Sequence, residues 1–183
     1  VIQALDLPTG SKILEVGSAT SKLALEFASM GYKITAMDFQ DYFFLHPNLE
    51  FVKGDFLNNS FSDNCFDVVV AVSSIEHYGL GLYGESESDD GDKQVIKEIH
   101  RVLKAGGKLV FTAPFGRSGT RPKKYRVYDA KTLRELLEGF TVLKKSFFVN
   151  TADSHWLPAT EEAASKTYSL ATDFIQGVAC VVA

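Results

Sequence analysis

Acidic residues and a loop of small residues stand where the predicted strands end. Glu15 and Gly17 close the first apolar run, and small residues continue through 18–21. Asp38 ends the second run, about 20 residues later, and Asp55 follows the third. Parallel sheets bind ligands at the carboxyl ends of their strands, where small residues let main-chain N–H groups approach a ligand. Because a carboxylate at position 38 can accept hydrogen bonds from two ribose hydroxyls, the pattern predicts a nucleoside site.

Such a site suits either NAD or S-adenosylmethionine, and three residues distinguish the two. The dinucleotide fingerprint requires a glycine where the helix packs against the strand, and Lys22 occupies that position. Glu15 would repel a pyrophosphate but suits a ligand that carries an ammonium and a sulfonium. Asp55 is placed to reach the adenine edge or its neighbours. These residues favour S-adenosylmethionine over NAD as the cofactor, and so argue against an NAD-dependent oxidoreductase.

Four successive segments resemble the motifs of class I S-adenosylmethionine-dependent methyltransferases. Residues 13–38 (ILEVGSATSKLALEFASMGYKITAMD) resemble motif I and the acidic loop, and residues 51–79 are similar to the next two motifs. Residues 96–116 (IKEIHRVLKAGGKLVFTAPFG) and 126–140 are similar to the segments that follow. The resemblance implies an α/β, Rossmann-like three-layer sandwich. Its seven-stranded, mostly parallel sheet would have an antiparallel last strand, in a single domain over residues 1–183.

The resemblance also implies which residues hold the cofactor. They come from the loops after the first four strands: Glu15, Gly17, Ser18, Ala19, Asp38, Phe39, Gly54, Asp55, Phe56 and Ser73. The family has glycines where Ala19 and Ser21 stand. Alanine is tolerated there if its torsions are ordinary, whereas Ser21 could crowd the methionine part of the cofactor. A second function therefore stays open, that of a non-catalytic methyltransferase-like partner subunit.

The segment after the fourth strand, residues 73–78 (SSIEHY), is expected to face the transferred methyl group. His77 is the candidate catalytic residue, as general base for a hydroxyl or amine nucleophile. The alternative is that Glu76 and His77 hold the loop through hydrogen bonds. We expect methyl transfer to an O or N atom of a small-molecule acceptor.

Two charged clusters raise further hypotheses. Asp89, Asp90 and Asp92 could hold a metal ion, but helix capping is the favoured interpretation, and no metal is predicted. Residues 117–126 (RSGTRPKKYR) hold five cations and could attract an anionic or sugar-linked acceptor; the alternative is a solvated basic loop. RNA is a weaker option, because this stretch contains one aromatic residue, Tyr125, and the chain is acidic.

The elements that must position these residues alternate between strand and helix patterns. Helices are expected over 20–30, 92–103 and 130–137, the second ended by Gly106-Gly107 and the third capped by Asp129. Residues 79–92 are expected to form a loop. The alternation indicates βαβ units and a parallel sheet. Strands are expected over 12–16, 32–37, 49–52, 66–72, 108–112, 140–149 and 177–182.

Composition sets the remaining expectations. The chain has 183 residues, is 45% hydrophobic and carries a net charge of -4, as expected of a soluble globular domain with no overall attraction for nucleic acid or anionic membranes. No apolar run long enough to span a membrane occurs, and no signal segment begins the chain. Cys65 and Cys180 are expected to be reduced thiols in the cytoplasm. Because the chain opens at Val1, an upstream segment is expected to have been removed.

Overall fold

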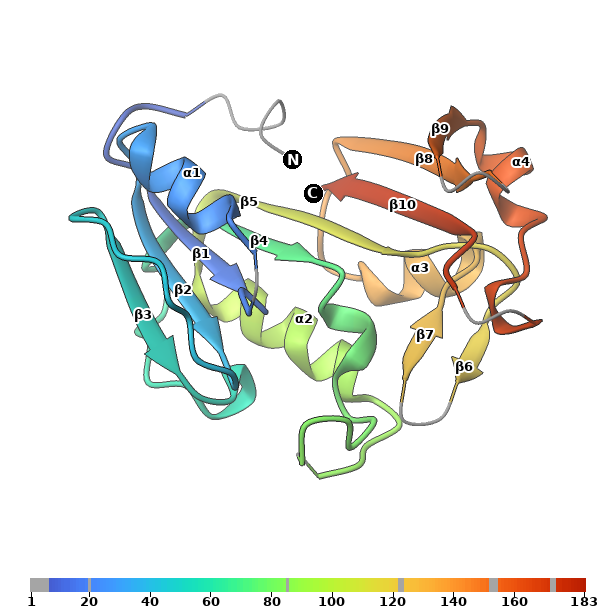
Figure 1. The fold of residues 1–183 in the computed structure, drawn as a ribbon, viewed down its shortest axis with the longest axis horizontal. Coiled ribbons are helices and arrows are strands. Elements are labelled where there is room, and N and C mark those ends of the chain that lie inside the picture. The colour runs from blue at the N-terminus through green and yellow to red at the C-terminus, as the bar shows by residue number, and fades with distance from the viewer. Residues whose placement is uncertain (1–6, 20, 85, 122–123, 152–154, 172–173) are drawn as a thin grey trace. The chain divides into compact units, whose positions relative to one another are not determined.

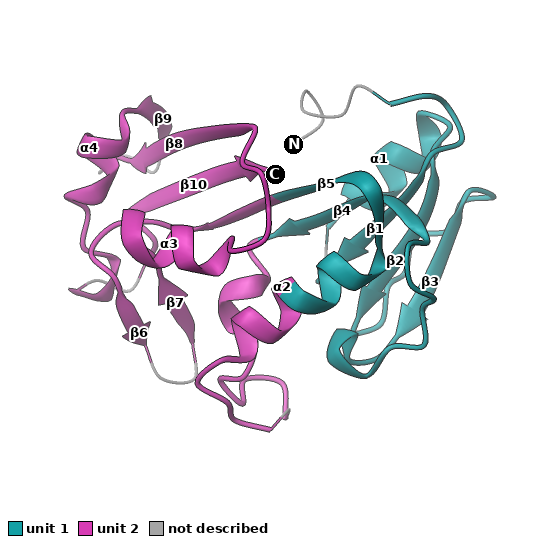
Figure 2. Cartoon of the chain, turned by 180° about the vertical axis from the view of Figure 1, so that it is seen from behind, with its two compact units in different colours: residues 1–72, 97–110 teal, residues 73–96, 111–183 magenta. Residues whose placement is uncertain are grey.

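The computed structural model describes residues 7–19, 21–84, 86–121, 124–151, 155–171 and 174–183. The chain divides into two compact units, which Figure 2 shows in different colours. Unit 1 comprises residues 1–72 and 97–110, and unit 2 comprises residues 73–96 and 111–183. The predicted single domain over residues 1–183 stays a prediction.

The strands form a mixed sheet, as predicted, with eight members in place of seven. Their order is β3-β2-β1-β4-β5-β10-β8-β9, and β6 and β7 form a separate pair (Figure 1). The additional strand is β9 (Trp156–Ala159), which pairs antiparallel with β8 (Lys144–Asn150). Its short sequence, which includes Pro158, lacks the alternating pattern by which strands are recognised.

Unit 1 contains the parallel half of the sheet. β1 (Lys12–Val16) pairs in parallel with β2 (Lys33–Asp38) and with β4 (Phe66–Val72), and β2 pairs in parallel with β3 (Leu49–Lys53). The apolar run of β1 is buried from its second residue onward, as expected for a strand between two neighbours. α1 (Leu23–Ser29) begins later than predicted, and the Ser21 hydroxyl accepts a hydrogen bond from the first N–H of the helix, at 3.0 Å.

The junction of α2 (Gly91–Val102) and β5 (Leu103–Pro114) corrects one prediction. Gly106 and Gly107 lie inside β5 and do not end the helix. The carbonyls of Arg101 and Val102 accept hydrogen bonds from the N–H groups of residues 64 and 65, at 3.0 and 2.9 Å. The last turn of α2 is therefore capped by a distant segment of chain, which frees the glycines for the start of the strand.

Unit 2 contains the antiparallel strands. β8 pairs with β10 (Gly177–Val182) and with β9, so the predicted closing strand pair is confirmed. The predicted capping of α3 (Ala130–Leu136) by Asp129 is also confirmed, with a reciprocal capping box to Thr132. The remaining elements are β6 (Gly119–Arg121), β7 (Tyr125–Val127) and α4 (Glu161–Ser165). Within the described ranges, no helix has the length and apolar character to cross a membrane.

Candidate functional site

The loop after β1 and the end of β2 lie together. The N–H groups of Gly17 and Ser18 donate to the Met37 carbonyl, at 2.9 and 3.3 Å. Asp38 accepts from the N–H of Ala19 through Oδ2 and from the N–H of Gln40 through Oδ1, both at 2.8 Å. Each carboxylate oxygen has a second lone pair, so these bonds orient Asp38 without exhausting its capacity to accept from a ribose.

The torsions of the loop depart from the expectation for Ala19. Gly17 has φ 79°, which suits glycine, but Ala19 has φ 20°, at the edge of the left-handed region. Alanine pays a steric cost there that glycine does not pay. Its torsions are therefore not ordinary, and the loop holds a residue that its backbone disfavours.

Three buried polar side chains near this loop have no hydrogen-bond partner among the described residues. They are the Glu15 carboxyl, the Ser18 hydroxyl and the Tyr42 hydroxyl. Glu15 and Ser18 are completely buried, and Tyr42 is 7% exposed. Burial raises the pKa of Glu15 to about 7; the Ser21 hydroxyl and the Ala24 main chain lower it, without forming bonds of normal geometry. An unpaired buried carboxyl is costly, so this position calls for a ligand that brings a donor.

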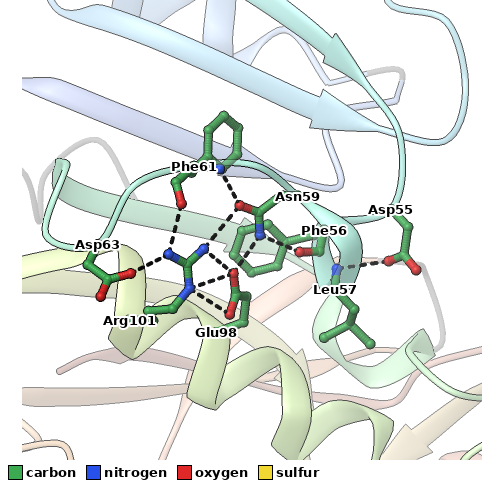
Figure 3. Close-up of polar contacts among 8 residues, drawn as sticks. All are labelled: Asp55, Phe56, Leu57, Asn59, Phe61, Asp63, Glu98 and Arg101. Atoms are coloured by element: carbon green, nitrogen blue, oxygen red, sulfur yellow. Dashed lines mark hydrogen bonds and ion pairs between the residues drawn. The ribbon is translucent and has the colours of Figure 1, made fainter.

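Asp55 begins the short turn η2 (Phe56–Asn58) after β3. The N–H of the preceding Gly54 donates to the Asp38 carbonyl at 2.9 Å, which places the main chain of Gly54 beside that of Asp38. The Asp55 carboxylate accepts from the Leu57 N–H at 2.9 Å (Figure 3) and from the Asn58 amide at 2.8 Å. Phe56 is 1% exposed, so any contact that it makes with a ligand would come from its main chain. Phe39 is half-buried.

In unit 2, Ser73 and His77 are held by the main chain and by Thr112. Ser73 has φ 49°, and its N–H donates to the Thr112 hydroxyl at 2.9 Å. His77 lies in η3 (Ile75–His77), and its Nδ1 bonds to the Lys124 carbonyl. A carbonyl only accepts, so Nδ1 carries the proton, and in the neutral imidazole the lone pair is on Nε2. This tautomer suits a general base.

Glu76, next to that histidine, is 2% exposed, and its Oε2 has no hydrogen-bond partner among the described residues. Burial raises the pKa of Glu76 to about 8. Its Oε1 lies 3.9 Å from His77 Nε2, which is beyond hydrogen-bond length. The alternative prediction was that Glu76 and His77 hold the loop through hydrogen bonds. Such a bond is present for His77, between its Nδ1 and the Lys124 carbonyl.

The basic stretch forms the β6–β7 hairpin, and Arg126 within it is 7% exposed. Its guanidinium donates to three carbonyls of the loop predicted over 79–92 and its flank, those of Tyr78, Ser88 and Asp89. This corrects the expectation that Arg126 attracts an acceptor, because a guanidinium used inside the protein is not offered to a ligand. Arg117, by contrast, lies over the Tyr168 ring, 5.3 Å from its centroid.

Asp92 stands at the start of α2, as predicted, and also has a buried role. It is 5% exposed; its Oδ2 accepts from the Tyr128 hydroxyl at 2.8 Å and lies 3.8 Å from Arg126 Nε. Asp92 therefore belongs to the buried cluster around Arg126, although it also stands in the first turn of α2. Asp90 pairs with Lys93 at 3.4 Å on the surface. Across the described ranges, no group of His, Cys, Asp and Glu is arranged to hold a metal ion.

A family model described as a methyltransferase domain matches residues 14–111, which is more than half of the chain. The chain belongs to the class I S-adenosylmethionine-dependent methyltransferases. Demethylmenaquinone methyltransferase of Paenarthrobacter aurescens is 30% identical over 115 residues, covering 60% of this chain and 41% of that protein. Sterol 24-C-methyltransferase of Gibberella zeae is 34% identical over 115 residues, covering 56% and 27%. The chain thus spans less than half the length of either relative.

Solved structures agree with the fold of this methyltransferase. A methyltransferase from Methanosarcina mazei has a TM-score of 0.67 at 18% identity, covering 99% of this chain and 95% of its own. The [4+2]-cyclase SpnF has a TM-score of 0.66 at 22% identity, covering 96% and 75%. At these identities the similarity establishes the α/β architecture.

Within unit 1 of the methyltransferase, the structure joins the loop at Gly17 to Asp38 and places Gly54 beside Asp38. Ser73 and His77 belong to unit 2. Sequence reasoning missed Tyr42, for which no motif gave a signal. It also missed the network that joins α2 to the η2 turn through Glu98 and Arg101, whose i,i+3 spacing on a helix was a usable signal.

Proposed function

We propose that this chain is the catalytic domain of an S-adenosylmethionine-dependent methyltransferase that methylates a small molecule. The observation that carries the proposal is the completely buried Glu15 carboxyl beside the Gly17 loop, unpartnered among the described residues. A cation satisfies such a carboxyl best, and S-adenosylmethionine brings an ammonium and a sulfonium. The buried hydroxyls of Ser18 and Tyr42 supply further polar atoms without partners.

In this proposal each element of unit 1 holds one part of the cofactor. Glu15 pairs with the ammonium, and Gly17, Ser18 and Ala19 offer main-chain groups beside it. Asp38 accepts from the ribose hydroxyls, with Phe39 against the nucleoside. The adenine lies along Gly54, Asp55 and Phe56. The bound cofactor supplies an electrophilic methyl group on sulfur.

His77 acts as the general base in the proposed reaction. The bond from Nδ1 to the Lys124 carbonyl fixes the ring in the tautomer whose Nε2 carries the lone pair, and this nitrogen would take a proton from an O or N nucleophile. The name of one relative, a sterol 24-C-methyltransferase, adds a carbon acceptor as an alternative. The Tyr83 ring stands edge-on to His77, 6.4 Å between centroids, and would form part of an acceptor pocket.

The proposed acceptor is anionic or sugar-linked, attracted by the hairpin cations other than Arg126. We place the reaction in the cytoplasm, in agreement with two free cysteines. A double Arg117→Gln/Arg121→Gln variant should raise the KM of an anionic acceptor severalfold, with kcat unchanged. An equal KM in the two proteins would remove the anionic part of the proposal.

The strained torsion of Ala19 favours a second function, a methyltransferase-like partner subunit that binds the cofactor weakly or not at all. Calorimetric titration with S-adenosylmethionine and S-adenosylhomocysteine separates the two functions. Binding at micromolar concentration, followed by release of S-adenosylhomocysteine with a panel of quinol, sterol, phosphate and sugar-linked acceptors, supports the enzyme. Absence of binding at millimolar ligand supports the partner subunit. A His77→Gln variant that binds the cofactor normally but turns over slowly would support the role of the base.

A further inference from the structure

A continuous hydrogen-bond network connects α2 to the turn that carries Asp55 and Phe56 (Figure 3). All of it lies within unit 1. The Asn59 amide nitrogen donates to the Phe56 carbonyl and to Glu98 Oε1, both at 2.6 Å. The Asn59 amide oxygen accepts from the Phe61 N–H at 2.7 Å and from Arg101 at 3.2 Å. Both ends of one side-chain amide are therefore used, and Asn59 links the Phe56 carbonyl of the η2 turn to Glu98 and Arg101 of α2.

Arg101 is the other centre of this network. Its guanidinium makes bonds of 2.5 to 3.0 Å to the Glu98 carboxylate, and it donates to the Phe61 carbonyl at 2.8 Å and to Asp63 at 2.5 Å. The hydrogen bond from Arg101 lowers the pKa of Glu98 and keeps this carboxylate ionised. A planar guanidinium can serve these directions at once, whereas a lysine ammonium is a single point charge.

The chain between β3 and β4 has little regular structure of its own, so this network is what orders it. The connection from β3 to β4 contains no α-helix, only the three-residue turn η2. Nothing in the regular hydrogen bonding of the sheet fixes residues 56–63, so the side chains of α2 supply that order. Asn59 donates a hydrogen bond to the Phe56 carbonyl, which is one peptide unit away from Asp55.

We propose that Asn59, Glu98 and Arg101 are positioning residues for the adenine end of the cofactor site. They hold the main chain of Phe56 and the carboxylate of Asp55 in the geometry that receives the nucleoside. This inference rests on the proposed function, since it takes Asp55 and Phe56 as the residues that face the adenine. The positioning residues themselves need not touch the cofactor.

Calorimetric titration tests this inference without knowledge of the acceptor. The ligands are S-adenosylhomocysteine and adenosine, and the proteins are the wild type, Asn59→Ala and Arg101→Lys. Both variants should bind both ligands about tenfold more weakly, because one net hydrogen bond to the turn is lost. Equal weakening of the two ligands is the decisive readout, since it assigns the loss to the part that they share.

Lys104→Met is the matched control. Lys104 pairs with Asp67 at 2.6 Å in the same unit, and its side chain is 42% exposed against 33% for Arg101. Its removal should change the affinity for either ligand less than twofold. A purely structural role for the network predicts instead that Asn59→Ala and Arg101→Lys lower the Tm but bind like the wild type well below it, which would overturn the inference.

A double variant that moves the carboxylate from position 98 to position 59 keeps the inference testable if a single variant folds poorly. Asn59→Asp alone places two carboxylates in contact and should bind adenosine weakly. Asn59→Asp combined with Glu98→Gln restores a donor opposite an acceptor between these two side chains but leaves the Phe56 carbonyl without its donor, so the double variant should fold without recovering the lost affinity. Wild-type affinity in the folded double variant, whose Phe56 carbonyl lacks its donor, counts against the inference. A wild-type protein that binds neither ligand refutes the proposed function itself, and the inference with it.

Discussion

Cofactor binding should depend on the ionisation of Glu15. Burial raises the pKa of this carboxyl to about 7, and the nearby Asp38 and Glu26 charges add to the rise. Only the ionised carboxylate pairs with the ammonium of the cofactor, so binding must first remove a proton from the neutral form. At pH 7 this amounts to about half a proton released for each cofactor bound.

The size of the effect follows from that pKa. The apparent Kd is multiplied by one plus the ratio of neutral to ionised carboxyl, which is about 33 at pH 5.5 and about 1.3 at pH 7.5. Affinity should therefore fall about 25-fold between pH 7.5 and 5.5, equivalent to about 2 kcal/mol. The ligand's own ammonium stays protonated across most of this range, since an α-amino group has a pKa near 8.

Isothermal titration with S-adenosylhomocysteine across this pH range measures the Kd, and buffers of different ionisation enthalpy measure the proton release. The matched control is Glu15→Gln, which keeps the shape of the side chain but cannot ionise. This variant should bind S-adenosylhomocysteine more weakly than the wild type at pH 7.5, and its Kd should not change with pH. A wild-type Kd that does not change with pH, or an unchanged slope in Glu15→Gln, would refute the reasoning.

Three further perturbations have defined outcomes. The folded-state pKa values of Glu15 and Glu76, about 7 and about 8, lie above the ordinary 4.5, so the protein without cofactor should lose stability as pH rises from 4.5 through these values. Glu76→Gln should therefore raise the Tm at pH 8.5, recovering about 3 to 5 kcal/mol, with little change at pH 4.5; equal shifts at both pH values would contradict this. Ala19→Gly should stabilise the fold by about 0.5 to 1 kcal/mol in thermal unfolding, because glycine tolerates φ 20°, and a lower Tm would show the torsion to be harmless. In denaturant titration, Arg126→Met should lower the free energy of unfolding by about 3 to 5 kcal/mol, and Arg117→Gln should lower it by less than about 1 kcal/mol. Similar losses in the two variants would show that the burial of Arg126 is unimportant.

The elements with regular periodicity could be predicted from the sequence. β4 was predicted to the residue because a continuous β-branched run is typical of a parallel strand covered on both faces, and Asp129 capped α3 because its type and place are those of an N-cap. The Gly106-Gly107 pair was misread as a helix end. The carbonyls of α2 are capped by residues 64 and 65, and contacts across such separations leave no local pattern.

The candidate site, too, was predicted only in part from the sequence. The carboxylates at strand ends were recognised from their spacing, since spacing fixes where a strand end lies. The environments of these side chains were not recognised, because the burial of Arg126 depends on the path of a loop 40 residues earlier. A cation in a basic stretch and a cation inside a buried cluster look alike in a sequence. Only the packing of the hairpin distinguishes Arg126 from Arg117.

The anchoring of the loop at residues 78–91 has a consequence for how its sequence could diversify. Arg126 binds main-chain carbonyls there, and every amino acid has a carbonyl. The loop requires glycine where it closes on itself, at Gly79 and Gly91, because a Cβ there would collide with the opposing main chain. Leu80 is buried, and Gly81 and Gly84 have φ of 67° and 89°, which favour glycine. Its other side chains can be exchanged while the same backbone path is kept. A library randomised at Leu82, Tyr83, Ser86 and Glu87 alone should therefore yield mostly folded proteins, from which new acceptor preferences could be selected.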